Sequence, residues 1–153
     1  MKKSDRISAQ VAGLGTDSSL ALHPCYQGYF TCFNAQQYYE AHDVLEHLWL
    51  SVRDENFHFF KGLIQLAGAF VHLQKQFLRP HHPKDGRRLR PAVRLFHLAR
   101  LNLERYAPRR LQLDVAAVIR LADQYAGAIT ASEYGVNPWA PESAPRLKLE
   151  GTG

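Results

Sequence analysis

The segment from Phe57 to Leu78 constrains the fold most, because apolar side chains surround nearly the whole helix that it predicts. At about 100° per residue, its polar exceptions, Lys61, Gln65 and His72, form one narrow stripe. The apolar positions that cover the rest of the helix are Phe59, Phe60, Leu63, Ile64, Leu66, Ala67, Phe70, Val71 and Leu73. A helix of this kind is stable when other elements cover it on several sides. We therefore expect it in the middle of the fold.

Two further helices are predicted after this segment. Residues 79–86 contain Pro and Gly and are expected to form a loop. The next helix should end at Ala107 and Pro108, because proline does not continue a helix. Another helix should begin at Asp114, a good N-cap residue, with an apolar stripe that reaches Ile129.

The helix that precedes the central one is expected to extend from Asn34 to about Val52. Asn34 is a good N-cap residue, and Gln37 completes a variant of the capping box. Residues 21–33 are rich in aromatic side chains and should pack on the domain as an approach segment. No strand alternation is visible. The predicted class is therefore all-α, a compact bundle of four main helices with irregular N- and C-terminal segments.

The length of 153 residues suits one domain with a hydrophobic core. We expect a mobile polar segment at residues 1–20, a single helical domain at 21–133 and an irregular tail at 134–153. No apolar run approaches the ~20 residues that span a bilayer, and no continuous apolar signal segment is visible. Cys25 and Cys32 match no zinc-binding spacing. Reduced thiols and a cytoplasmic location are the resulting expectations.

The positive charge is concentrated in one stretch of the chain. The net charge is +5, yet residues 79–110 hold ten of the nineteen Lys and Arg against two acids, Asp85 and Glu104, which gives +8 there and −3 elsewhere. The arginines expected on one face of the predicted third helix are Arg87, Arg90, Arg94 and Arg105. This asymmetry indicates an anionic partner.

The candidate site lies in the segment Tyr38–Trp49. His42 and Glu46 are one turn apart and share a face with apolar side chains, so both are expected to point toward the interior. Burying such groups costs several kcal/mol unless they pair or bind a ligand. His72 of the central helix is expected nearby. The pocket residues expected beside these groups are Tyr39, Trp49 and Gln65.

Imidazole and carboxylate groups bind divalent zinc, manganese or iron, and helical bundles draw metal ligands from facing helices. We therefore consider His42, Glu46 and His72 as metal ligands, with Glu40 or Asp43 as the catalytic carboxylate that acts on a metal-bound water. The spacing matches neither the zincin motif nor the paired di-iron motif. Two alternatives stay open: a buried His–Glu network that fixes the helix register, and a metal-free ligand site.

Several motifs of this chain resemble one known family over roughly residues 30–76. These motifs are Phe33-Asn34, Tyr39-Glu40-Ala41-His42-Asp43-Val44-Leu45-Glu46, Trp49, Gly62-Leu63-Ile64-Gln65-Leu66-Ala67 and His72. The family is the domain-of-unknown-function family numbered 309, small helical proteins of bacteria and archaea that are sometimes described as predicted metal-dependent hydrolases. The resemblance implies a helical fold and an expectation of hydrolysis. The chain departs from the family pattern at Asp43, where Glu is usual, and in the loop at residues 79–86.

Two functional hypotheses follow. The first is a metal-dependent hydrolase that acts on a small molecule. The second is a non-enzymatic helical interaction module, in which the His/Glu cluster is a structural network and the basic face binds an anionic partner. Nucleic acid is not favoured, because no base-reading motif is present. The sequence indicates no membrane partner and leaves a homo-oligomer open.

Overall fold

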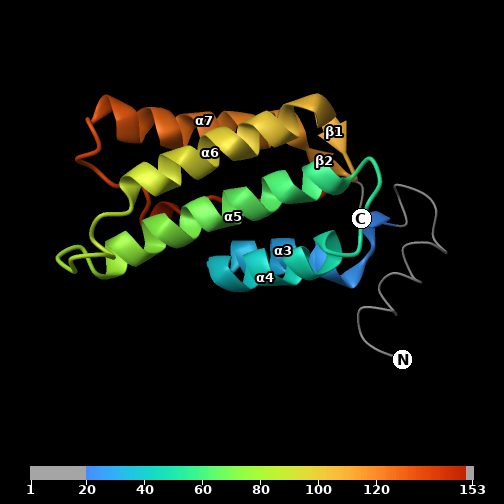
Figure 1. The fold of residues 1–153 in the computed structure, drawn as a ribbon, viewed down its shortest axis with the longest axis horizontal. Coiled ribbons are helices and arrows are strands. Elements are labelled where there is room, and N and C mark those ends of the chain that lie inside the picture. The colour runs from blue at the N-terminus through green and yellow to red at the C-terminus, as the bar shows by residue number, and fades with distance from the viewer. Residues whose placement is uncertain (1–19, 151–153) are drawn as a thin grey trace.

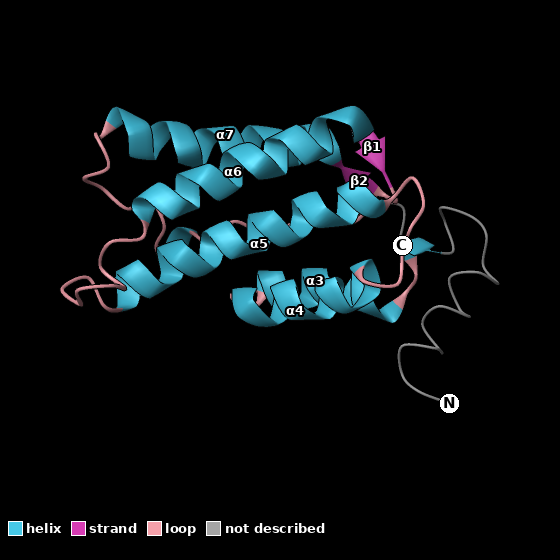
Figure 2. Cartoon of the chain, in the orientation of Figure 1, coloured by secondary structure: helices cyan, strands magenta, loops and turns pink. Residues whose placement is uncertain are grey.

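The computed structural model describes residues 20–150 of the chain. Within them it has five α-helices, a two-stranded hairpin and two short 3₁₀ helices (Figures 1 and 2). The helices are α3 (Pro24–Asn34), α4 (Tyr38–Trp49), α5 (Phe57–Leu78), α6 (Leu89–Leu103) and α7 (Val115–Ala131), with η1 (Glu104–Tyr106) and η2 (Pro141–Ser143). The antiparallel strands are β1 (Arg109–Arg110) and β2 (Leu113–Asp114). The predicted mobile segment at 1–20 lies outside the described residues except for Leu20.

The α5 helix lies between two helical pairs, with α3 and α4 on one side and α6 and α7 on the other (Figure 1). Its bounds are those expected, and its buried residues include Phe59, Phe60, Leu66 and Phe70. The prediction of a central helix is confirmed. The mostly helical class is confirmed as well, whereas the expected number of four main helices is too low by one.

The additional helix is α3, which replaces the expected approach segment. Pro24 occupies its first turn, and the His23 side chain accepts a hydrogen bond from the backbone N–H of Cys25 at 3.0 Å. Both features favour a helix start. The buried aromatic residues Tyr26, Tyr29, Phe30 and Phe33 follow the spacing of one helical face.

The expected N-cap at Asn34 is wrong, because Asn34 is the last residue of α3. The chain then turns through Gln36, whose φ of 61° lies in the left-handed region and interrupts the helix. The α4 helix begins at Tyr38, and Gln37 at its N-cap makes no side-chain capping bond. The residues that resemble a capping box, Asn34 and Gln37, therefore lie at the C-terminal end of α3 and in the turn that follows it.

Close backbone approach joins α5 to α6. A Cβ atom at Gly62 would lie 2.7 Å from Cγ of Leu103, and one at Gly68 would lie 3.1 Å from Cδ1 of Leu95. Glycine at these positions lets leucine side chains of α6 fill the space beside α5.

The segment after α7 packs on the helical core. Trp139 is 2% exposed and donates a hydrogen bond from Nε1 to the hydroxyl of Tyr38 at 3.0 Å. The side chain of Asn34 makes two hydrogen bonds with the backbone of Leu147, both 2.7 Å long. These contacts fix residues 134–150 against α3 and α4.

No helix among residues 20–150 combines the length and the apolar composition that crossing a membrane requires.

Candidate functional site

The outer face of α4 brings together four of the predicted site residues, Tyr39, His42, Asp43 and Glu46. Nδ1 of His42 lies 3.1 Å from Oδ1 of Asp43, and Nε2 of His42 lies 4.0 Å from Oε2 of Glu46. The ring of Tyr39 stacks on the His42 ring, with 6.4 Å between their centroids. Glu40 is exposed on the same helix. An imidazole with carboxylates on both sides thus lies on the surface of α4.

The expected burial of His42 and Glu46 is wrong. Their side chains are 32% and 42% exposed. The residues of α4 that pack into the core are Tyr38, Ala41, Leu45 and Leu48. His42 and Glu46 each follow one of these buried residues directly, so the helix rotates them by about 100° toward solvent. Solvent access removes most of the desolvation cost that motivated a buried site.

The Asp43 contact orients the His42 ring. When Nδ1–H is donated to the Asp43 carboxylate, the lone pair stays on Nε2, the nitrogen nearer to Glu46. The separation of 4.0 Å between Nε2 and Oε2 is too long for a hydrogen bond. Carboxylate–imidazole pairs of this kind orient metal-binding histidines in proteins.

His72 makes a different contact, with the start of α6. Its Nδ1 lies 3.1 Å from NH1 of Arg88. Burial lowers the pKa of His72 to about 4, and the positive charges of Arg88 and Lys75 act in the same direction. Since arginine only donates, neutral His72 accepts at Nδ1 and carries its proton on Nε2. A metal would have to displace Arg88 or this proton to bind the ring.

The remaining predicted pocket residues also have separate partners. Oε1 of Gln65 accepts a hydrogen bond of 2.7 Å from Asn102 of α6. The ring of Trp49 packs on Phe57 at 5.0 Å between centroids, and its buried Nε1 has no hydrogen-bond partner within residues 20–150. Gln65 thus takes part in the α5–α6 contact, and Trp49 closes the junction between α4 and α5.

Across the described part of the chain, no group of three or more His, Cys, Asp and Glu side chains is arranged to hold a metal ion. The structure brings His42 to Asp43 and Glu46, and it brings His72 to Arg88. The divalent-metal set of His42, Glu46 and His72, with Glu40 or Asp43 as the catalytic carboxylate, stays a prediction.

The second candidate feature is the basic face, which we define as the exposed residues Arg87, Arg90, Arg94 and Arg105. Their expected exposure is confirmed. None of the four forms an ion pair with a carboxylate of residues 20–150. By contrast, Arg88 pairs with Asp85, and Arg100 pairs with Asp123. Within residues 20–150, the positive charge of the basic face is therefore not neutralised by an ion pair.

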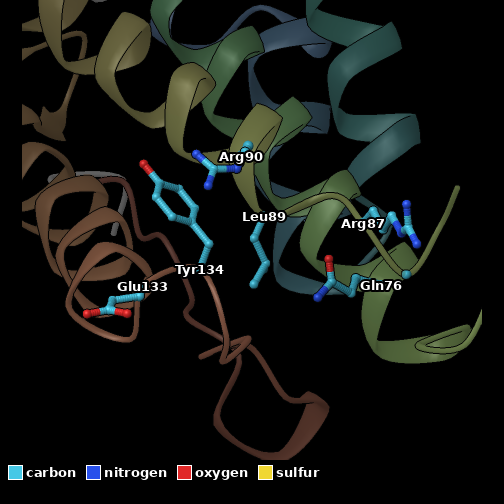
Figure 3. A pocket seen from close by; sticks show the side chains of 7 residues that line it. Gln76, Arg87, Leu89, Arg90, Glu133 and Tyr134 are labelled. Atoms are coloured by element: carbon cyan, nitrogen blue, oxygen red, sulfur yellow. The ribbon is translucent and has the colours of Figure 1, made fainter.

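A pocket of about 380 Å³ lies at one end of the basic face (Figure 3). Its lining consists of Gln76, Gly86, Arg87, Leu89, Arg90, Glu133 and Tyr134. The guanidinium carbon of Arg90 lies 4.2 Å from the centre of the Tyr134 ring. Sequence reasoning missed this pocket, because Tyr134 belongs to the expected tail and no local pattern links it to α6. The unpaired arginines were the only signal that pointed to this end of the molecule.

Comparison with known proteins bears on the first of these two features. The family described as Domain of unknown function (DUF309) matches residues 26–80, from within α3 to just after α5. The resemblance of the sequence to this family is thereby confirmed over these residues. No curated protein and no solved structure matches the chain. The DUF309 segment contains all of the site residues predicted on α4 and α5, whereas Arg87, Arg90 and Tyr134 lie outside it.

Proposed function

We propose that the protein is a non-enzymatic helical interaction module whose basic face docks on an acidic protein surface. The observation that carries this proposal is the set of four exposed arginines without carboxylate partners in residues 20–150. Exposed charges of one sign produce a potential that attracts and orients a partner of opposite sign.

The helix geometry adds to the argument. The first turn of α6 contains no acidic residue, although Arg90 lies within it and Arg87 lies two residues before its first residue, Leu89. Positive charge is unfavourable at the positive end of a helix dipole, typically by about 0.3–1 kcal/mol per charge. Asp85 offsets the charge of Arg88, but Arg87 and Arg90 have no such counter-charge in the described residues. A negatively charged partner would offset the positive charges of Arg87 and Arg90.

The type of partner follows from the side chains present. The one aromatic residue of α6, Phe96, is 1% exposed, so this helix offers no ring on the basic face and base stacking is not favoured. An acidic protein surface needs only charge complementarity and exposed carboxylates. One source of such a surface is a second copy of this chain, because α4 exposes Glu40, Asp43 and Glu46.

The test is a binding titration against polyglutamate at increasing salt. We expect binding at low ionic strength that weakens steeply as the Debye length falls to about 8 Å at 0.15 M salt. The double variant Arg94→Ala, Arg105→Ala should bind at least about tenfold more weakly, whereas the control Arg120→Ala on α7 should bind like the original protein. Equal losses in both variants would refute a defined face. Tight binding of an oligonucleotide at 0.15 M salt would instead identify nucleic acid, and light scattering would reveal self-association.

A second candidate function is metal-dependent hydrolysis at α4. It is favoured by the Asp43–His42 pair, which leaves the Nε2 lone pair beside Glu46. In this hypothesis His42, Glu46 and His72 would hold the ion, Glu40 or Asp43 would be the catalytic carboxylate, and the ion would supply a Lewis acid. Metal analysis of protein purified without a histidine tag tests it. About one equivalent of zinc, manganese or iron, lost in His42→Ala, would support it; equal metal content in both proteins would refute it.

A further inference from the structure

The pocket at the end of the basic face has two polar sides separated by an apolar floor. Figure 3 shows Arg90 over the Tyr134 ring on one side, Gln76 on the other and Leu89 between them. Leu89 is 5% exposed, so it closes the floor of the pocket. The carboxylate of Glu133 points away from Arg90 and Gln76 in the same view. The polar groups that face the space are therefore mainly hydrogen-bond donors.

The donors on the two sides are fixed by contacts outside the pocket. The Tyr134 ring covers one flat face of the Arg90 guanidinium, which leaves the N–H groups at its edge free for an oxyanion. Oε1 of Gln76 accepts the backbone N–H of Arg88 at 2.7 Å. Because this bond occupies the carbonyl oxygen, the amide NH₂ of Gln76 remains available as a donor.

The position of Tyr134 is held by an unusual backbone turn. Glu133 and Tyr134 have φ values of 56° and 61°, which are uncommon for residues with a large side chain. Hydrogen bonds stabilise the turn: the N–H of Tyr134 donates to the carbonyl of Ile129 at 2.9 Å, and the N–H of Val136 donates to Oγ of Ser132 at 3.0 Å. The aromatic side of the pocket is thus formed before any ligand arrives, which lowers the entropy cost of binding.

We propose that this pocket binds a small phosphate monoester; of the basic face, Arg87 and Arg90 line the pocket, whereas Arg94 and Arg105 are not among its lining residues. The phosphate would accept hydrogen bonds from the edge of Arg90 and from the amide of Gln76, with Arg87 adding positive charge at the rim. The organic part would lie against Leu89 and Tyr134. The volume of about 380 Å³ suits a small organic ligand. Two guanidinium groups favour a doubly charged phosphate over a singly charged carboxylate.

The experiment compares phenyl phosphate, inorganic phosphate and benzoate as probes, with binding followed by NMR signals of arginine Nε–H and glutamine NH₂ groups. We expect saturable binding of phenyl phosphate and inorganic phosphate, with benzoate weaker by about tenfold. Tighter binding of phenyl phosphate than of inorganic phosphate supports the contact of the organic part with Leu89 and Tyr134. Equal affinities for the two would overturn that part of the proposal.

Two variants and one control make the test specific to the pocket. Arg90→Ala should weaken phosphate binding by about tenfold or more. Gln76→Glu keeps an acceptor for the Arg88 N–H but replaces the amide donor with a negative charge, so it should abolish phosphate binding. This second variant leaves the contact between Arg90 and Tyr134 in place, so its effect does not depend on whether Arg90→Ala moves the Tyr134 ring. Arg94→Ala, one turn further along α6, should leave the affinity unchanged within about twofold. Absence of saturation at about 10 mM probe, or equal losses in Arg90→Ala and Arg94→Ala, would overturn the proposal.

Discussion

Arg88 donates a hydrogen bond from NH1 to Nδ1 of His72 at 3.1 Å and thereby joins the beginning of α6 to α5. The same guanidinium donates from Nε and NH2 to Oδ1 of Asp85, at 3.0 and 2.6 Å. One arginine thus holds an imidazole and a carboxylate at once. Because arginine stays charged, this arrangement requires His72 to be neutral.

His72 should therefore make stability depend on pH. Its pKa is about 4 in the folded state, against 6.5 for the unfolded side chain. Between these values the unfolded chain binds the proton and the folded protein does not, so the free energy of unfolding falls as the pH decreases from 6.5 toward 4. The loss should be on the order of 2 kcal/mol, allowing for partial solvent access.

The measurement is urea unfolding across this pH range for the original protein and for His72→Gln. The glutamine variant keeps a polar side chain but cannot take up the proton, so the difference in unfolding free energy between the two proteins should change with pH. A constant difference would contradict the assigned pKa of His72. An NMR titration of the His72 ring provides an independent value.

Gly62 tests the close approach of α5 and α6. A Cβ atom there would lie 2.7 Å from Cγ of Leu103 and 3.2 Å from the carbonyl oxygen of Ala99. Gly62→Ala gains helix propensity, about 1 kcal/mol, but should still destabilise the protein by about 1–3 kcal/mol through overpacking.

Gly127 provides the matched control, because it also lies inside a helix, is exposed and has nothing within 4 Å of an added Cβ. Gly127→Ala should stabilise the protein by about 0.5–1 kcal/mol. Both variants are compared by denaturant unfolding. If Gly62→Ala proved as stable as Gly127→Ala, the packing of α6 on α5 would have to be looser than the structure shows.

Hydrophobic periodicity predicted the central helix well but not the beginning of the fold. The bounds of α5 match the expected segment, and the side chain of Asp114 caps α7 by accepting the N–H of Ala117 at 2.9 Å. Asn34 carried an equally good capping pattern, yet its side chain binds Leu147, which is 113 residues away. A local rule cannot anticipate a tertiary partner that distant.

The candidate site illustrates a second limit of periodicity. The sequence predicts that His42 and Glu46 share a face, and the structure places them within 4.0 Å of each other. Which face of the amphipathic helix is buried depends on small rotations that the spacing alone does not determine, since Ala41 and Leu45 are direct neighbours of the polar pair. The pocket at Tyr134 could not be predicted from the sequence, because its backbone turn has no local sequence signature.

Asn34 should anchor the C-terminal segment. Its amide donates to the carbonyl oxygen of Leu147, and its Oδ1 accepts the Leu147 N–H. Asn34→Asp keeps the acceptor but replaces the donor with an oxygen that faces a carbonyl, which should destabilise this contact by about 1–2 kcal/mol. Hydrogen exchange at the Leu147 amide should become faster in this variant. The control Gln124→Glu, at an exposed site on α7, should leave that exchange rate unchanged.

Tyr38 and Tyr39 form a matched pair for the contact between α4 and Trp139. Tyr38 is fully buried, and its hydroxyl accepts the Nε1–H of Trp139 at 3.0 Å, whereas Tyr39 is 60% exposed. Tyr38→Phe would leave a buried N–H without a partner, so it should lower the free energy of unfolding by about 1–3 kcal/mol. Tyr39→Phe removes a hydroxyl from the surface and should change stability by less than about 0.5 kcal/mol. Urea unfolding followed by tryptophan fluorescence and by circular dichroism measures both variants. Equal stabilities would mean that the Trp139 N–H finds another partner once the Tyr38 hydroxyl is removed, and the structural role assigned to this hydrogen bond would be wrong.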